Sequence, residues 1–150
     1  GTGHDEYARY SEENEVWERN MERLVRKYET AKQYVPKPVL STMKGAKFGI
    51  LSIGSNDPGI VEARAIMAKE GIPTDYLRVR AVPFTQEVED FLRTHERVYV
   101  VEANRDGQIM QLLTLAFTSL AGRLRKNSRN DGLPLSARWI RESILAQEEK

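Results

Sequence analysis

Residues 98–108 read VYVVEANRDGQ, a run of strand-forming side chains that ends in a polar turn. The first four residues are β-branched or aromatic, as expected of a strand covered on both faces of a sheet. Helical spacing begins directly beyond Gly107 and Gln108, with IMQLL at 109–113. A buried strand, a short polar turn and a helix form the repeating unit of parallel α/β sheets. Such domains usually bind ligands at the carboxyl ends of their strands.

The same alternation recurs on both sides of this stretch. KFGILSI (47–53) is too short for a helix, and the segment after it has helical spacing with Pro58 in its first turn and Asn56 or Asp57 as the expected N-cap. Ser136 is the expected N-cap of the last helix. Strands are thus predicted at 47–53, 72–82 and 97–103, and helices at 57–71, 85–97, 107–120 and 136–150. The order predicts an α/β fold with three layers, a doubly wound and mainly parallel sheet.

A different pattern occupies the first third of the chain. Apolar residues recur at steps of four and three until Pro36 and Pro38, namely Trp17, Met21, Leu24, Tyr28, Ala31 and Val35. This spacing predicts a long amphipathic helix. Its continuous seam suits a neighbouring helix, so a homo-oligomer through the 17–35 helix is expected; the alternative is that the helix covers its own domain's core. We therefore predict an interdomain segment and connector helix at 1–45, before the α/β domain at 46–150.

Composition excludes several classes of function. The 23 basic and 22 acidic side chains give a net charge of +1, so no nucleic-acid partner is expected. The chain has no cysteine, and therefore no disulfide, thiolate nucleophile or cysteine-ligated iron–sulfur cluster of its own. No apolar run is long enough to span a bilayer, so no membrane partner is expected. The opening residues lack a signal-peptide pattern, and the predicted localisation is cytoplasmic.

Two turns are candidate ligand or interface loops. Backbone amides of GSNDPG (54–59) at a helix start could hold an anion, although a simple capped turn is favoured and no nucleotide-binding motif is present. In the second turn a carboxylate and two amides could clamp a ligand or a partner's backbone, or cap the following helix. At the second turn no His, Cys or Ser–base pair lies close in sequence to complete a catalytic set, and no catalytic residue is predicted. The candidates are Gly54, Ser55, Asn56, Glu102, Asn104, Gly107 and Gln108.

One short segment concentrates positive charge. Arg123, Arg125 and Lys126 could meet an acidic partner or a phosphate-bearing ligand, or could protect a peripheral strand from edge-to-edge pairing. The two histidines, His4 and His95, do not form a metal site. His95 ends a predicted helix, where an imidazolium interacts favourably with the helix dipole. No metal site is therefore predicted.

Six segments in collinear order resemble 2-oxoacid:ferredoxin oxidoreductase alpha subunits. The opening is similar to that family's G-x-x-H-x-E-x-G run, with Ala8 where the family often has glycine. The other five match its charged helix, first strand and glycine–serine loop, L-R-x-x-x-P-F passage, V-V-E-x-N-x-x-G-Q signature and closing D-G-L-P-L segment. They read here MERLVRKYETAK, FGILSIGSNDPGIVEA, YLRVRAVPFTQEVEDFL, VYVVEANRDGQIMQLL and NDGLPLSARWI.

The resemblance implies a C-terminal domain like that of transketolase, with one antiparallel edge strand expected at 121–129. It implies a holoenzyme that uses thiamine diphosphate, magnesium, an iron–sulfur cluster and coenzyme A to convert a 2-oxoacid, 2-oxoglutarate rather than pyruvate, to an acyl-CoA with reduction of ferredoxin. The implied partners are the rest of the alpha subunit and a beta subunit. This domain would serve assembly, bind none of these cofactors itself and be inactive alone. The alternative is a free-standing α/β module that binds an anion or another small molecule. A third hypothesis is that this domain contacts coenzyme A through Arg123, Arg125 and Lys126.

Overall fold

A computed structural model describes residues 3–149, and the chain divides between Val35 and Pro36 into two compact units. The first unit holds α1 (Asn14–Ala31). A loop precedes this helix, and in it the Asp5 carboxylate accepts hydrogen bonds from the backbone N–H groups of Tyr7 and Arg9, both at 2.9 Å. The helix ends at Ala31, before its predicted end at residue 35. Beyond it the backbone N–H groups of residues 32–34 bond carbonyls three residues back, as in a tighter 3-10 turn, and Val35 is restricted because it precedes a proline.

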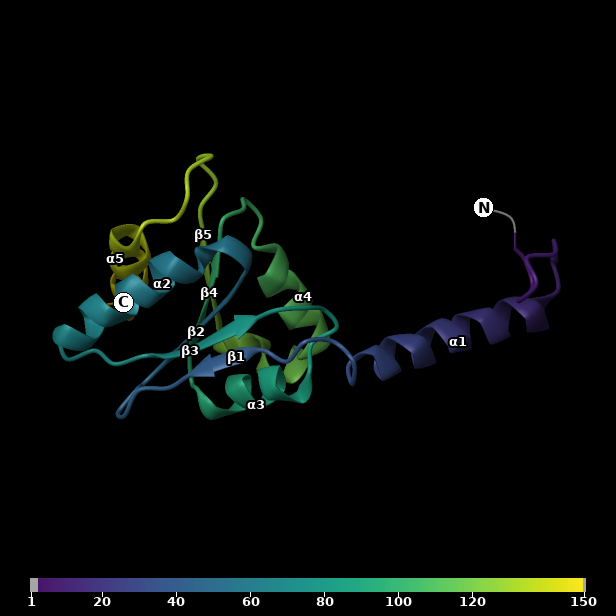
Figure 1. The fold of residues 1–150 in the computed structure, drawn as a ribbon, viewed down its shortest axis with the longest axis horizontal. Helices are drawn as coiled ribbons and strands as arrows, with labels where there is room; N and C mark the ends of the chain where they lie inside the picture. Colours follow the sequence, from purple (N-terminus) through teal and green to yellow (C-terminus); the bar gives the residue numbers. More distant parts are fainter. Residues whose placement is uncertain (1–2, 150) are drawn as a thin grey trace. The chain divides into compact units, whose positions relative to one another are not determined.

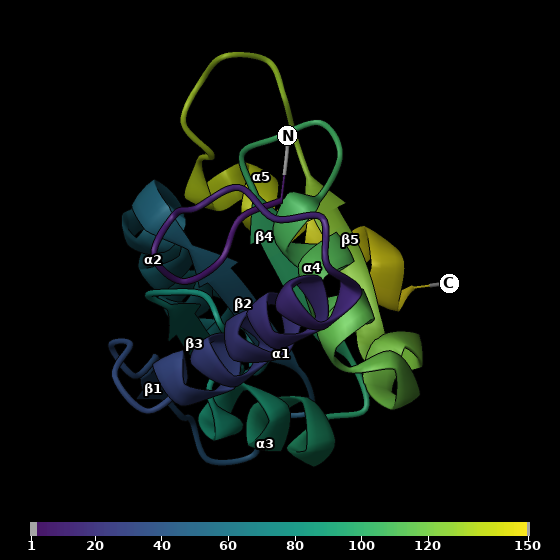
Figure 2. The same cartoon turned by 90° about the vertical axis from the view of Figure 1, so that its right-hand side faces the viewer.

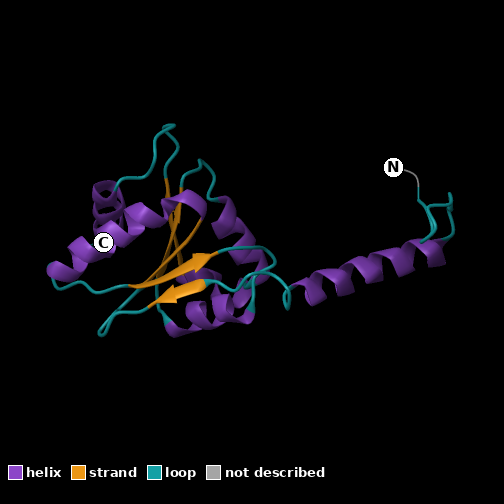
Figure 3. Ribbon diagram, viewed as in Figure 1, coloured by secondary structure: helices purple, strands orange, loops and turns teal. Residues whose placement is uncertain are grey.

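The second unit is built on one five-stranded sheet in the order β1-β3-β2-β4-β5. Its strands are β1 (Val39–Ser41), β2 (Gly49–Ile53), β3 (Asp75–Val79), β4 (Val98–Glu102) and β5 (Leu124–Ser128). All neighbouring pairs are parallel except β1 with β3, whose arrows oppose one another in Figure 3. The predicted fold class, a mainly parallel sheet with one antiparallel edge strand, is confirmed.

The position predicted for the antiparallel edge is wrong. Residues 124–128 form β5, which pairs with β4 in parallel, because the intervening helix carries the chain back to the end where β4 began. The antiparallel strand is β1 instead, in the segment that the sequence presented as a linker. All three residues of β1 are exposed, so no apolar alternation marks it. As a result the compact sheet unit begins at Pro36, whereas the predicted domain began at 46.

Helices cover both faces of the sheet. Figure 1 shows α2 (Asp57–Lys69) and α5 (Ala137–Glu148) together on one side, and α3 (Gln86–Thr94) and α4 (Gln108–Ala116) on the other. Each side has its own apolar core, centred on Ile50, Tyr99 and Ile140 in one and on Leu51, Val100 and Leu113 in the other. The turned view in Figure 2 shows α4 beside β5 at the edge of the sheet. Short 3-10 turns at Gly54–Asn56 and Thr118–Arg123 complete the connections.

None of the helices in the described part of the chain is long and apolar enough to cross a bilayer. The Ser136 cap of the last helix is confirmed, since its hydroxyl accepts a hydrogen bond from the backbone N–H of Trp139 at 3.3 Å.

Candidate functional site

The two predicted turns meet at one end of the sheet. β2 and β4 are neighbours in the sheet, and the chain leaves β2 toward one face through α2 and leaves β4 toward the other through α4. In open α/β sheets this switch point leaves a crevice at the carboxyl ends of the strands. A pocket of about 350 Å³ lies there, lined by Ile53, Gly54, Ser55, Asn56, Glu102, Ala103, Asn104, Gln108, Ile109 and Leu112.

Glu102 is the last residue of β4, and its side chain is directed at the start of α4. It is 2% exposed, and its carboxylate accepts hydrogen bonds from the backbone N–H groups of Ile109 at 2.8 Å and Met110 at 3.0 Å. The side-chain amide of Asn104 donates a third, at 2.7 Å. A carboxylate at a helix start also interacts favourably with the helix dipole. Glu102 therefore acts as a helix cap, supplied from a strand.

Asn104 completes the same cap. Its Oδ1 atom accepts hydrogen bonds from the backbone N–H of Gly107 at 2.6 Å and of Gln108 at 3.3 Å. Glu102 and Asn104 together thus satisfy four successive N–H groups, those that a helix leaves without partners at its start. The sequence left helix capping and ligand clamping as equal alternatives for this turn, and its geometry is that of a cap.

Gly107 makes the turn tight enough for this cap. Its φ of +74° lies in the left-handed region, where glycine is strongly preferred. A Cβ atom at this position would lie 3.2 Å from Ser128 Oγ and 3.6 Å from the Glu102 carboxylate. The glycine therefore allows β5 and the carboxylate to approach the start of α4.

The other turn is arranged differently from its prediction. Asn56 occupies the N-cap position of α2, yet its side chain makes no capping bond and points inward, 3.4 Å from Ser52 Oγ. Asp57, the other expected cap, accepts a hydrogen bond from the Tyr76 hydroxyl at 3.0 Å. Burial, and then this bond, raise the pKa of Tyr76. Gly54 and Ser55 are exposed at the rim of the pocket.

The pocket has a mostly neutral lining. Among its described lining residues Glu102 is the one ionisable side chain, and its carboxylate is already bonded to three donors. A general base must reach the proton that it abstracts, and a carboxylate committed to a helix start does not. Its exposed lining residues include Ser55, Gln108 and Leu112, whose side chains suit hydrogen bonding and packing against another protein surface.

The three candidate cations, Arg123 just before β5 and Arg125 and Lys126 within it, are not brought together. Arg123 Nη1 donates hydrogen bonds to the carbonyl oxygens of Arg93 and His95 at 2.9 and 2.8 Å. It thereby satisfies carbonyl groups at the C-terminus of α3. Successive residues of a strand point to opposite faces of the sheet. Arg125 lies on the face of Tyr99, whereas Lys126 lines a pocket beside α4 and donates to a backbone carbonyl at 3.1 Å. The geometry does not gather these side chains around one anion.

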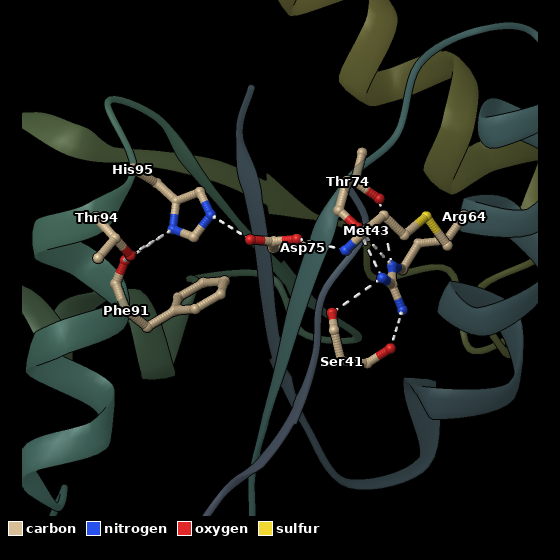
Figure 4. A network of polar contacts seen from close by, with 8 residues as sticks. All are labelled: Ser41, Met43, Arg64, Thr74, Asp75, Phe91, Thr94 and His95. Carbon is tan, nitrogen blue, oxygen red and sulfur yellow. Dashed lines mark hydrogen bonds and ion pairs between the residues drawn. The ribbon is translucent and has the colours of Figure 1, made fainter. Parts of the chain in front are cut away.

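A polar network at the opposite end of β3 was missed from the sequence. Figure 4 shows Asp75 between His95 on one side and Met43 on the other. Asp75 Oδ2 lies 3.1 Å from His95 Nε2, and Oδ1 accepts from the Met43 backbone N–H at 2.8 Å. His95 is 7% exposed, and its Nδ1 lies 2.8 Å from the Phe91 carbonyl oxygen. His95 lies at the end of α3, as predicted, and its ring also links that helix to Asp75 of β3.

The second half of that network is a buried arginine. Arg64 is 4% exposed and donates to the Thr74 carbonyl at 2.6 Å, to Ser41 Oγ at 3.0 Å and to the Ser41 carbonyl at 3.0 Å. Burial lowers its pKa. These bonds connect α2 to β1 and to the residue that precedes β3. In the sequence, what indicated that Arg64 is buried was its position one turn after Ile60, on the stripe of α2 that faces the core.

The end of α5 is fixed by a third polar cluster. The Tyr99 hydroxyl donates to Glu148 Oε1 at 2.5 Å, and Arg97 bonds both oxygens of that carboxylate at 2.7 and 2.9 Å. Burial, and then the bond to Glu148, raise the pKa of Tyr99. Burial raises the pKa of Glu148, but its bonds to Arg97 and Tyr99 outweigh this and hold it below the ordinary value.

The described residues do not suit the metal centres that the resemblance implies for a whole enzyme. Thiolates are the usual ligands of iron–sulfur clusters, and the sequence contains no cysteine. Across residues 3–149, His, Asp and Glu side chains form no group of three that could hold a metal ion. The described residues therefore supply no ligands for an iron–sulfur cluster and no metal cage made of protein side chains alone.

Comparisons with known proteins agree with the motifs. No protein-family model matches the chain. Over 125 residues it is 34% identical to 2-oxoacid:ferredoxin oxidoreductase 2, subunit alpha, of Aeropyrum pernix, a match that covers 80% of this chain. The chain is homologous to a region of a 2-oxoacid:ferredoxin oxidoreductase alpha subunit. It spans only 19% of the length of that relative.

Two solved structures share the fold of this alpha-subunit region. A 2-oxoglutarate:ferredoxin oxidoreductase from Magnetococcus marinus, with 2-oxoglutarate, coenzyme A and succinyl-CoA bound, superposes with a TM-score of 0.78 at 18% identity and covers 96% of this chain and 25% of its own. A split-gene transketolase, solved as an inactive β4 tetramer, gives 0.58 at 18% identity over 72% of this chain and 40% of its own. The predicted transketolase-like fold is confirmed.

Proposed function

We propose that this region is an assembly domain of a 2-oxoacid:ferredoxin oxidoreductase alpha subunit and performs no chemistry itself. The observation that carries the proposal is the state of Glu102. The one ionisable side chain of the switch-point pocket is buried and bonded to the start of α4. What the pocket offers to a partner is a rim of exposed polar and apolar groups, Ser55, Gln108 and Leu112.

The proposed holoenzyme oxidatively decarboxylates a 2-oxoacid with coenzyme A, and yields an acyl-CoA, carbon dioxide and reduced ferredoxin. The name of the Aeropyrum pernix relative supports the 2-oxoacid and ferredoxin. The ligands named for the Magnetococcus marinus structure support 2-oxoglutarate, rather than pyruvate, and coenzyme A. Thiamine diphosphate, magnesium and an iron–sulfur cluster belong, on this proposal, to other domains or to a beta subunit.

Assembly can be tested with variants at the rim of the pocket. In the full-length alpha subunit, Gln108→Trp places a large ring at an exposed position whose side chain takes no part in the helix cap. We expect it to weaken complex formation with the beta subunit, measured by size-exclusion chromatography with light scattering. Lys47→Trp, exposed before β2 at the other end of the sheet, is the matched control. Normal assembly of Gln108→Trp would contradict the proposed interface.

Catalysis provides a separate test. We expect the 150-residue chain alone to give no turnover of 2-oxoglutarate or pyruvate when coenzyme A, thiamine diphosphate and an electron acceptor are supplied. Turnover by this chain would overturn the noncatalytic assignment. Calorimetry of the chain with phosphate, a nucleotide and coenzyme A distinguishes the alternative of an anion-binding module, because that module would release heat with one of them.

A further inference from the structure

The edge strand β1 joins the sheet without burying any of its side chains. Val39 and Leu40 are 51% and 57% exposed, and Ser41 is exposed as well. Other strands of the same sheet differ, since every residue of β4 is buried and so are four of the five residues of β2. The ion pair between Lys37 and Glu87, just before β1, lies on the surface, where such pairs contribute little. Segments with few buried apolar contacts open locally at a low free energy, so β1 is expected to open before β2 or β4.

Side-chain hydrogen bonds hold β1 in place of apolar burial. Arg64 donates to Ser41 Oγ and to the Ser41 carbonyl, both at 3.0 Å, and Asp75 Oδ1 accepts from the N–H of Met43 at 2.8 Å (Figure 4). These bonds have a cost, because the Arg64 guanidinium is removed from water, and this burial lowers its pKa. The net free energy that keeps β1 on the sheet is therefore expected to be small.

The backbone N–H groups of β3 are divided between its two neighbouring strands. The Asp75 N–H bonds the carbonyl of Phe48, just before β2, at 3.3 Å, so this residue is directed at β2. Successive residues of a strand direct their N–H groups to opposite sides. The N–H of Leu77 therefore also faces β2, whereas those of Tyr76 and Arg78 face β1. We call the latter two the β1-facing amides of β3.

We propose that residues 39–43 form a strap that detaches from β3 as one unit while β2, β3, β4 and β5 stay paired. Detachment breaks the contacts of Ser41 and Met43. It leaves both apolar cores intact, because the described residues of these cores include none from the strap. Opening lengthens the stretch between α1 and the first paired strand from residues 32–38 to residues 32–48. The strap is thus a releasable joint between α1 and the sheet.

Amide hydrogen exchange, followed by NMR on the 150-residue chain, tests the strap within a single strand. After correction for intrinsic rates, the β1-facing amides of Tyr76 and Arg78 are expected to exchange at least about tenfold faster than the amide of Leu77, although the three residues are consecutive. Their exchange should also depend less steeply on urea, because opening the strap exposes little surface. Equal rates with the same urea dependence would overturn the proposal, because the sheet would then open as a whole.

Ser41→Ala tests whether Arg64 holds the strap. The change removes a hydroxyl that accepts from Arg64, at an exposed position outside both cores. We expect exchange at the β1-facing amides to rise at least about threefold, with the Leu77 amide unchanged. Thr42→Ala is the matched control, because it removes a neighbouring exposed hydroxyl that lies outside the bonds made by Arg64. Unchanged exchange in Ser41→Ala, or an equal rise in Thr42→Ala, would overturn the role of Arg64 in holding the strap.

Discussion

Glu102 Oε2 accepts a hydrogen bond from the backbone N–H of Ile109 at 2.8 Å, which joins the end of β4 to the first turn of α4. Since the second carboxylate oxygen accepts from Met110, replacing one oxygen by an NH₂ group sets donor against donor. We expect Glu102→Gln to lower the free energy of unfolding by about 1–3 kcal/mol, measured by urea denaturation. Glu62→Gln on the exposed side of α2 should change it by less than about 0.5 kcal/mol. If Glu102→Gln and Glu62→Gln had the same free energy of unfolding, Glu102 would not act as a helix cap.

Gly107 is expected to be intolerant of any side chain. Its φ of +74° strains other residues, and a new Cβ would meet Ser128 Oγ at 3.2 Å. Gly107→Ala should therefore cost at least about 1 kcal/mol of unfolding free energy. Gly122→Ala is the control, because its Cβ would meet no atom within 4 Å and its φ is not positive. If Gly107→Ala were as stable as that control, the tight turn would not be needed.

The cluster at Glu148 predicts a dependence of stability on pH. Its pKa in the folded chain lies below the ordinary 4.5, because the bonds to Arg97 and Tyr99 outweigh burial. The ionised carboxylate therefore contributes its full stability above pH 4.5, and this contribution is lost as the pH falls through the lower folded value. We expect the difference in unfolding free energy between wild type and Glu148→Gln to shrink on acidification below pH 4.5. A difference that stays constant down to pH 2.5 would contradict the assignment.

Ala8 sits in the left-handed region of backbone conformation, with a φ of 64°. Ala8→Gly relieves a strain of about 1–2 kcal/mol, partly offset by the greater entropy of the unfolded glycine chain. We expect slower hydrogen exchange at Ser11, whose N–H bonds the Gly3 carbonyl at 3.1 Å across this loop. Ala31→Gly, at the end of α1, should give no such protection. Unchanged exchange at Ser11 would show that the alanine is not strained.

The layer order of the second unit could be predicted because its strands and helices have distinct periods. Val98–Val101 are buried on both faces, and the apolar stripe of α3 recurs at Val88, Phe91 and Leu92. β1 could not be predicted in this way, because its three exposed residues join the sheet through backbone hydrogen bonds, which leave no side-chain pattern.

The candidate site was predictable in position but not in detail. Glycines and polar groups after two apolar runs placed both turns at the carboxyl ends of strands, where β2 and β4 meet. Which atoms Glu102 would bond depended on a tertiary contact across the turn. The same holds for Arg64, whose bonds cross from α2 to Ser41 in β1 and to Thr74 just before β3, and for His95 with Asp75.

Hydrogen exchange measured by mass spectrometry, on the free 150-residue chain and on the assembled alpha and beta subunits, tests the assembly role most directly. If the switch-point rim is an interface, backbone amides at 54–56 and 103–108 should exchange more slowly in the assembly than in the free chain. Amides at 44–47, at the other end of the sheet, provide the internal reference. Equal exchange of the rim amides in both states would contradict the proposed role of this domain.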